Sequence, residues 1–191
     1  MPDTAADERL LRAVTALLAR KAVAAPAEIA ERIALTDAAS PAQGARMVAR
    51  AWVDPAYRAL LLADGTQAAE ALGIAMRGAP PLGVLENTAG LHHLVVCTLC
   101  SCYPRAVLGY PPFWFKSAAY RARAVRDPRG LLAEFGTVLA DGVRVRVVDS
   151  TADYRWMVLP QRPAGTEDWD EARLAAIVRE GDMIGVTQVT P

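Results

Sequence analysis

All three cysteines of this 191-residue chain lie within six consecutive residues, Cys97-Thr98-Leu99-Cys100-Ser101-Cys102. An odd number of closely spaced thiols does not form a disulfide framework, so Cys97, Cys100 and Cys102, hereafter the cysteine cluster, indicate a metal site or a redox site. Structural zinc usually takes two separated pairs of ligands, and the sequence has no second cysteine pair. The chain must therefore fold so that one short segment presents three sulfur atoms.

Composition and charge exclude several classes of partner. The 21 basic side chains balance 21 acidic ones, so neither nucleic acid nor an anionic membrane is expected as the main partner. No apolar run approaches the roughly 20 residues that span a bilayer. The segment Met1–Ala5 lacks the basic and apolar regions of a secretory signal. We therefore expect a cytoplasmic location.

The first 77 residues have a helical pattern. Apolar residues recur with helical spacing at Leu10, Leu11, Val14, Leu17 and Leu18. Pro26 is expected to end that helical segment or to restart it, and further helix starts are predicted at Ser40-Pro41 and at Asp54-Pro55. Thr66 is the expected cap of a short helix that ends at Gly73. Since strands are lacking here, we expect residues 1–77 to form a helical N-terminal arm whose apolar faces pack on a partner subunit.

A breaker-rich junction, Gly78–Gly83, separates this arm from a second domain at residues 78–191. Strands are predicted at Leu91–Val96, Val143–Val148 and Tyr154–Leu159. Helices are predicted at Lys116–Arg126, Asp127–Phe135 and Asp168–Glu180, the last with Gly181 as its C-cap. The expected fold class is α+β, a layered α/β-type domain with mixed short strands, preceded by the extended helical arm.

The spacing Cys100-Ser101-Cys102 has a specific chemical consequence. A metal held by both sulfurs lies against the backbone nitrogens of Ser101 and Cys102, which close six- and five-membered chelate rings. Cys97 can add an axial thiolate, so five protein donors leave one open position. Binding through deprotonated amides needs a strongly Lewis-acidic, low-spin trivalent ion, which favours cobalt(III) or iron(III) over zinc.

Two alternatives use the same segment differently. His92 and His93 could supply nitrogen ligands, although a histidine on a strand is more often packed or hydrogen-bonded. A thioredoxin-like Cys97–Cys100 redox pair would leave Cys102 without a role.

The segment Val96-Cys-Thr-Leu-Cys-Ser-Cys-Tyr-Pro104 resembles the metal site of nitrile hydratase α subunits. The resemblance extends over roughly residues 84–187, through Leu108-Gly-Tyr-Pro-Pro112, Trp114, Lys116-Ser117 and Tyr120-Arg-Ala-Arg123. It continues through Arg126-Asp-Pro-Arg129, Met157-Val-Leu-Pro160, Arg162-Pro-Ala-Gly-Thr-Glu167 and Met183-Ile-Gly-Val186.

This resemblance implies a site and a cofactor. Cys97, Cys100, Ser101 and Cys102 are the implied metal ligands, and Cys102, Cys100 and Ser101 the implied catalytic residues, with Cys100 oxidised to sulfinate and Cys102 to sulfenate. Thr98 and Tyr103 match the cobalt-type pattern, so one Co(III) per chain is expected, with Fe(III) as the second choice. The implied reaction is hydration of a small nitrile to the amide, a hydro-lyase activity.

The resemblance also implies partners. A β-type subunit, as one chain or split in two, would supply arginines to the oxidised sulfurs, and activity would require it. Three thiolates and two deprotonated amides outweigh a trivalent ion, and a buried anionic centre needs such cations. A cobalt-loading activator fits the slow ligand exchange of low-spin cobalt(III).

Other functions and other interpretations of single residues stay open. The metal-bearing subunit of thiocyanate hydrolase resembles this chain through the same cysteine spacing, and a non-enzymatic metal-binding or redox protein is a more distant alternative. Phe115 stands where a tyrosine is common in the family, which leaves the substrate range open. The basic run Arg121, Arg123, Arg126 and Arg129 is interpreted as a solvated helix face or as inter-subunit contacts.

Overall fold

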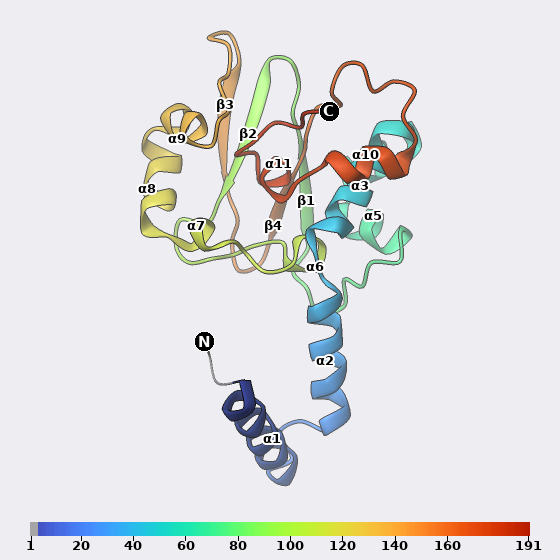
Figure 1. The fold of residues 1–191 in the computed structure, drawn as a ribbon, viewed down its shortest axis with the longest axis vertical. Helices are drawn as coiled ribbons and strands as arrows, with labels where there is room; N and C mark the ends of the chain where they lie inside the picture. Colours follow the sequence, from blue (N-terminus) through green and yellow to red (C-terminus); the bar gives the residue numbers. More distant parts are fainter. Residues whose placement is uncertain (1–3) are drawn as a thin grey trace. The chain divides into compact units, whose positions relative to one another are not determined.

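The computed structural model describes residues 4–191, and the chain divides into two compact units after Ala38 (Figure 1). The expected division at residues 77–78 therefore does not coincide with the boundary between the units. The reason is that the three helices between residues 41 and 71 belong to the second unit, Ala39–Pro191, and contribute to its core.

The first unit contains two helices, α1 (Thr4–Arg20) and α2 (Pro26–Ala38). Pro26 opens α2, as expected for a residue whose missing N–H costs nothing in the first helical turn. The apolar face of α1 is exposed, with 63% of Leu10, 51% of Leu11, 43% of Val14 and 39% of Leu17 accessible to solvent. No residue of α2 is buried. Among the described residues of this unit, no hydrophobic side chain belongs to a buried core.

The second unit begins with α3 (Pro41–Val53), α4 (Pro55–Ala63) and α5 (Gly65–Ala71). Asp54 caps α4 by accepting hydrogen bonds from the N–H groups of Ala56 and Tyr57. The prediction that Thr66 caps the next helix was wrong. Asp64 is the cap, and the Thr66 hydroxyl instead accepts a hydrogen bond from the N–H of Leu82.

Within the described residues, four short strands form two parallel pairs. The pairs are β1 (Leu82–Glu86) with β4 (Arg155–Leu159), and β2 (Leu91–Val96) with β3 (Arg144–Asp149) (Figure 1). The strand β1 was not predicted, because Gly83 reads as part of a breaker. The structure explains why a glycine stands here, because a Cβ at Gly83 would lie 2.5 Å from ring atoms of both Tyr154 and Trp156.

Helices cover these strands. The middle of the chain contributes α6 (Arg105–Leu108), α7 (Phe113–Lys116), α8 (Ala118–Arg126) and α9 (Pro128–Glu134). Helix α8 contacts β2, and α9 contacts β3. The helix predicted at Lys116–Arg126 is interrupted at Ser117, whose hydroxyl accepts a hydrogen bond from the N–H of Tyr120 and so starts α8.

The helix predicted at Asp168–Glu180 is two helices, α10 (Glu171–Ile177) and α11 (Glu180–Ile184). Gly181 lies inside α11, and Gly185 is the actual C-cap, with φ +84°. A Cβ at Gly185 would lie 1.9 Å from the carbonyl oxygen of His93. The end of α11 is therefore in direct backbone contact with β2, which only glycine permits.

The fold class is confirmed: helices mixed with short strands, preceded by a helical N-terminal region. The core of the second unit is continuous from α3 and α4 to α11 and includes Cys97 and Cys102. Within residues 4–191, no helix combines the length and the apolar character needed to cross a bilayer.

Candidate metal centre

The cysteine cluster follows β2 directly, at the edge where β3 also ends. Since β2 and β3 are parallel, their carboxyl ends meet here, and the carbonyl of Val96 accepts a hydrogen bond of 2.7 Å from the N–H of Ser150. Thr98 is tied to the end of β3, because both its N–H and its hydroxyl donate to the carboxylate of Asp149. The first residue after Cys97 is thus fixed from the neighbouring strand.

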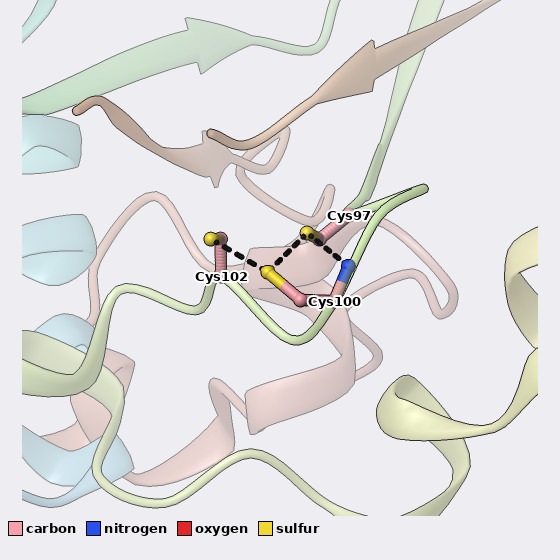
Figure 2. A group of neighbouring side chains, drawn as sticks. All are labelled: Cys97, Cys100 and Cys102. Carbon is pink, nitrogen blue, oxygen red and sulfur yellow. Dashed lines mark hydrogen bonds between the residues drawn. The ribbon is translucent and has the colours of Figure 1, made fainter. Parts of the chain in front are cut away.

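The three sulfur atoms face one another (Figure 2). The Sγ of Cys100 lies between the other two, 3.5 Å from that of Cys97 and 3.2 Å from that of Cys102. All three atoms lie within 4.8 Å of one another, which is close enough for one ion to contact all of them. Among residues 4–191, this is the one group of three or more cysteine, histidine or carboxylate side chains with such a spacing.

The three thiols differ in environment. Cys97 and Cys102 are 1% and 7% exposed, whereas Cys100 is exposed. Hydrogen bonds from Cys102, then from Cys97 and from the N–H of Ser101, lower the pKa of Cys100. Burial, together with the contacts to Cys100 and Cys97, raises the pKa of Cys102 to about 12. Cys100 is therefore a more acidic thiol than Cys102.

Backbone nitrogens point to the same place as the thiols. The N–H of Cys100 donates to the sulfur of Cys97 at 3.3 Å. The N–H groups of Ser101 and Cys102 also help to lower the pKa of Cys100. The converging group thus consists of soft sulfur donors, and among the described residues no carboxylate or imidazole joins it. Such a donor set suits a thiolate-binding transition metal and does not suit calcium or magnesium.

Two arginines near the cysteine cluster carry the buried side-chain nitrogens that lack a hydrogen-bond partner among the described residues, Nε of Arg121 and Nη1 of Arg155. Arg121 also donates from Nη1 to the carbonyl of Cys100 at 3.4 Å. Arg155 opens β4, and its charge acts on Cys102, partly offsetting the rise in that pKa. Orphaned donors are rare in folded proteins and here indicate missing acceptors beside the sulfurs.

Two tyrosines fix the backbone on either side of the cysteine cluster. Tyr103 is buried, and its hydroxyl donates to Glu180 at the start of α11. Burial, and then this hydrogen bond, raise the pKa of Tyr103, and burial also raises the pKa of Glu180. Tyr120 on α8 donates from its hydroxyl to the carbonyl of Val95 at 2.7 Å. Hydrogen bonds with α8 and α11 therefore fix the chain on both sides of the cysteine cluster.

The two histidines are structural, as their position on a strand suggested. The imidazole of His92 bonds to the side chain of Asn87 and to the carbonyl of Gly185. The backbone N–H and the ring of His93 both face the side-chain amide oxygen, Oδ1, of Asn87. Burial lowers the pKa of both histidines. Neither ring joins the sulfur group.

The basic run has several different roles. Arg123 pairs with Asp127 and Glu134, Arg129 donates to backbone carbonyls between residues 139 and 143, and Arg126 is exposed. A solvated face thus describes only part of this run. The two phenylalanines that flank Trp114 also differ, since Phe115 is buried in the core while Phe113 is 85% exposed.

Three residues around the site escaped sequence reasoning: Asp149 and Glu180, which accept hydrogen bonds from Thr98 and Tyr103, and Arg155, whose charge acts on Cys102. A signal existed for Asp149, because it directly follows a predicted strand, and the ends of parallel strands meet at one edge. Arg155 and Glu180 gave no such signal, since their approach depends on a turn and on the unexpected start of α11.

Comparisons with known proteins agree on one family. A family model described as "Nitrile hydratase, alpha chain" matches residues 5–187. The chain is 54% identical over 150 residues to the low-molecular weight cobalt-containing nitrile hydratase subunit alpha of Rhodococcus rhodochrous, covering 78% of this chain and 72% of that one. It is 46% identical over 162 residues to thiocyanate hydrolase subunit gamma of Thiobacillus thioparus, covering 79% and 67%.

A solved structure gives the same result for the fold. Recombinant thiocyanate hydrolase comprising partially-modified cobalt centers superimposes with a TM-score of 0.88 at 40% sequence identity, over 96% of this chain and 90% of that one.

Proposed function

The chain belongs to the nitrile hydratase alpha-chain family, and we propose that it is the cobalt-bearing α subunit of a nitrile hydratase. The carrying observation is the convergence of three thiols directly after β2, with their sulfur atoms within 4.8 Å of one another. The proposed reaction adds water to a small nitrile and yields the amide. We expect the protein to work in the cytoplasm.

The proposed ligands are the sulfurs of Cys97, Cys100 and Cys102 and the backbone nitrogens of Ser101 and Cys102. A bound cobalt(III) ion would supply Lewis acidity toward the nitrile or toward water. The proposal includes oxidation of Cys100 to sulfinate and of Cys102 to sulfenate. It also includes Cys102, Cys100 and Ser101 as the groups that contact substrate.

The chain's own residues prepare this site. Asp149 fixes Thr98, and Tyr103 is held by Glu180, so both ends of the cysteine segment are anchored before any ligand arrives. The exposure of Cys100 leaves one side of the cluster open for substrate. Arg155 places positive charge near Cys102, where the sulfur-rich centre needs it.

A β-type partner completes the proposed enzyme. The apolar face of α1 is exposed, and we propose that the N-terminal arm packs on the partner subunit. Leu99, between two of the cysteines, is 89% exposed, and Tyr110 and Phe113, which follow the cluster in sequence, are 64% and 85% exposed. Interaction surfaces are rich in such exposed apolar side chains. We propose that the partner covers these side chains and contributes further arginines, and that an activator loads the cobalt.

Thiocyanate hydrolase is the second candidate. It is supported by the 46% identity to a thiocyanate hydrolase gamma subunit and by the structural match at a TM-score of 0.88. In that case the substrate is an anion and hydrolysis proceeds to carbonyl sulfide and ammonia. The same cysteine cluster would serve both reactions, so the substrate separates the two candidates.

One experiment tests the proposal. The chain is co-expressed in cobalt medium with the gene products encoded beside it, and the purified complex is analysed for metal, intact mass and turnover of a nitrile and of thiocyanate. We expect one cobalt per chain, three added oxygen atoms on the cysteines, amide production, and little turnover by the chain alone. One equivalent of zinc, or a Cys97–Cys100 disulfide with no cobalt, would refute the proposal.

A further inference from the structure

The side chain of Arg121 reaches from α8 to the backbone of the cysteine cluster. Its Nη1 donates to the carbonyl oxygen of Cys100 at 3.4 Å, and its Nε is buried with no partner. The preceding residue, Tyr120, is fixed by its hydrogen bonds to Ser117 and to Val95 on β2. The position of Arg121 over the cluster is therefore set by the packing of α8.

The oxygen that Arg121 contacts belongs to a chemically special peptide. The carbonyl of Cys100 and the nitrogen of Ser101 form one amide group, and the proposed function uses that nitrogen as a deprotonated metal ligand. When the amide loses its proton, the negative charge is shared between nitrogen and oxygen, because the peptide bond is delocalised. The carbonyl oxygen facing the guanidinium is therefore the second atom that carries the ligand's charge.

We propose that Arg121 is a positioning residue: its hydrogen bond to the Cys100 carbonyl oxygen orients the Cys100–Ser101 peptide for metal binding. The inference rests on the proposed function. In the proposed site this peptide would supply the Ser101 nitrogen as a ligand, and the guanidinium would lie beside the oxygen that shares the ligand's negative charge.

The geometry fits a contact that tightens when the metal binds. At 3.4 Å the hydrogen bond is longer than the usual range, so it has room to shorten. Charge on the acceptor shortens such bonds and strengthens them about twofold.

The test compares two arginines of the same helix. Arg121→Met removes charge and donors while keeping an apolar stem, and Arg126→Met makes the same change at an exposed position. Both variants, and Arg121→Lys, are prepared as the cobalt-loaded complex with its partner. Cobalt per chain is followed during a chelator challenge, and the visible absorption of the bound cobalt is recorded.

We expect Arg121→Met to lose cobalt about 10- to 100-fold faster than the unaltered complex, the range for residues that support a metal ligand. The absorption of its remaining cobalt should shift, which a purely structural role would not cause. Arg121→Lys should recover part of the retention, and Arg126→Met should match the unaltered complex. If Arg121→Met does not fold, Arg121→Gln replaces it, with the same direction expected.

Equal cobalt retention and an unchanged spectrum in the folded Arg121 variants would overturn the inference while leaving the proposed function standing. An unaltered complex that holds no cobalt would instead overturn the proposed function, and the inference with it.

Discussion

Asp149 holds Thr98 by two hydrogen bonds, one from the backbone N–H at 3.0 Å and one from the hydroxyl. Thr98 lies between the first two cysteines, and Asp149 is the last residue of β3. A carboxylate that accepts two hydrogen bonds from one residue restricts both its backbone and its side chain. The neighbouring strand therefore sets where the cysteine segment begins.

Removing this carboxylate should weaken metal binding. We expect Asp149→Ala to reduce cobalt retention about 10- to 100-fold, because the segment after Cys97 loses its anchor. Asp153→Ala, at an exposed position beyond β3, is the matched control and should retain cobalt normally. Metal analysis after dialysis against a chelator measures the effect, and equal retention in the two variants would contradict the anchoring role.

Each cysteine is expected to be indispensable for the metal. Cys97→Ala, Cys100→Ala and Cys102→Ala should each abolish cobalt retention, since each removes a sulfur donor and, for the last two, a chelate ring. Ser101→Ala keeps the backbone nitrogen and should still retain cobalt. Cobalt content by elemental analysis decides between these outcomes. Full loading of any cysteine variant would remove that residue from the ligand set.

Hydroxyl removal at Tyr103 should destabilise the fold. Tyr103→Phe deletes a buried donor and leaves Glu180 without its hydrogen bond, which should lower the free energy of unfolding by about 1–3 kcal/mol. Tyr110→Phe makes the same change at a 64% exposed side chain and should change the free energy of unfolding by less than about 0.5 kcal/mol. Urea unfolding of the two variants gives the comparison, and similar midpoints would show that the Tyr103 contact adds nothing.

Acidification should destabilise the fold through two buried histidines. Burial lowers the pKa of His92 and His93 below the ordinary value of 6.5, so the unfolded chain binds more protons than the folded one as pH falls through 6.5. Their contribution to stability is complete above 6.5 and decreases below it. Urea unfolding between pH 8 and about 5 should show this loss, and His92→Asn with His93→Asn should flatten it. An unchanged slope in the double variant would assign the pH dependence to other groups.

Charge on the apolar face of α1 should weaken assembly. Leu10→Glu with Val14→Glu places two carboxylates on the exposed apolar face, and the reduced apolar contact should lower recovery of the partner in co-purification. Ala16→Glu adds a carboxylate on the opposite side of the same helix and should leave recovery intact. Normal assembly of the double variant would show that the partner does not use this face.

Much of this architecture could be predicted from the sequence, for local physical reasons. The alternation of valine and arginine predicted β3, and a segment rich in apolar residues predicted β2. The Asp-Pro pairs predicted where α4 and α9 begin. The failures share another cause. The strand β1 and the helix pair α10 and α11 depend on contacts between distant segments, as at Gly83 beneath Trp156 and at Gly185 against His93.

The candidate site, like the fold, could be predicted only in part. The cysteine spacing predicted the donor atoms, because chelate rings depend only on covalent neighbours, and the family resemblance is confirmed by the match over residues 5–187. The groups around the donors were not predictable from spacing. Asp149, Arg155 and Arg121 reach the cluster from three different elements, and only the folded chain brings them together.

The parallel pairing of β2 and β3 also means that the cysteine segment is synthesised before the strand that anchors it. Thr98 and its acceptor Asp149 are 51 positions apart, so during synthesis the thiols emerge from the ribosome several seconds before the strand that anchors them. Parallel strands so far apart in sequence also pair late in folding. A nascent chain therefore exposes three unanchored thiols to any available metal or oxidant. Selective cobalt loading requires either protection during that interval or correction after it.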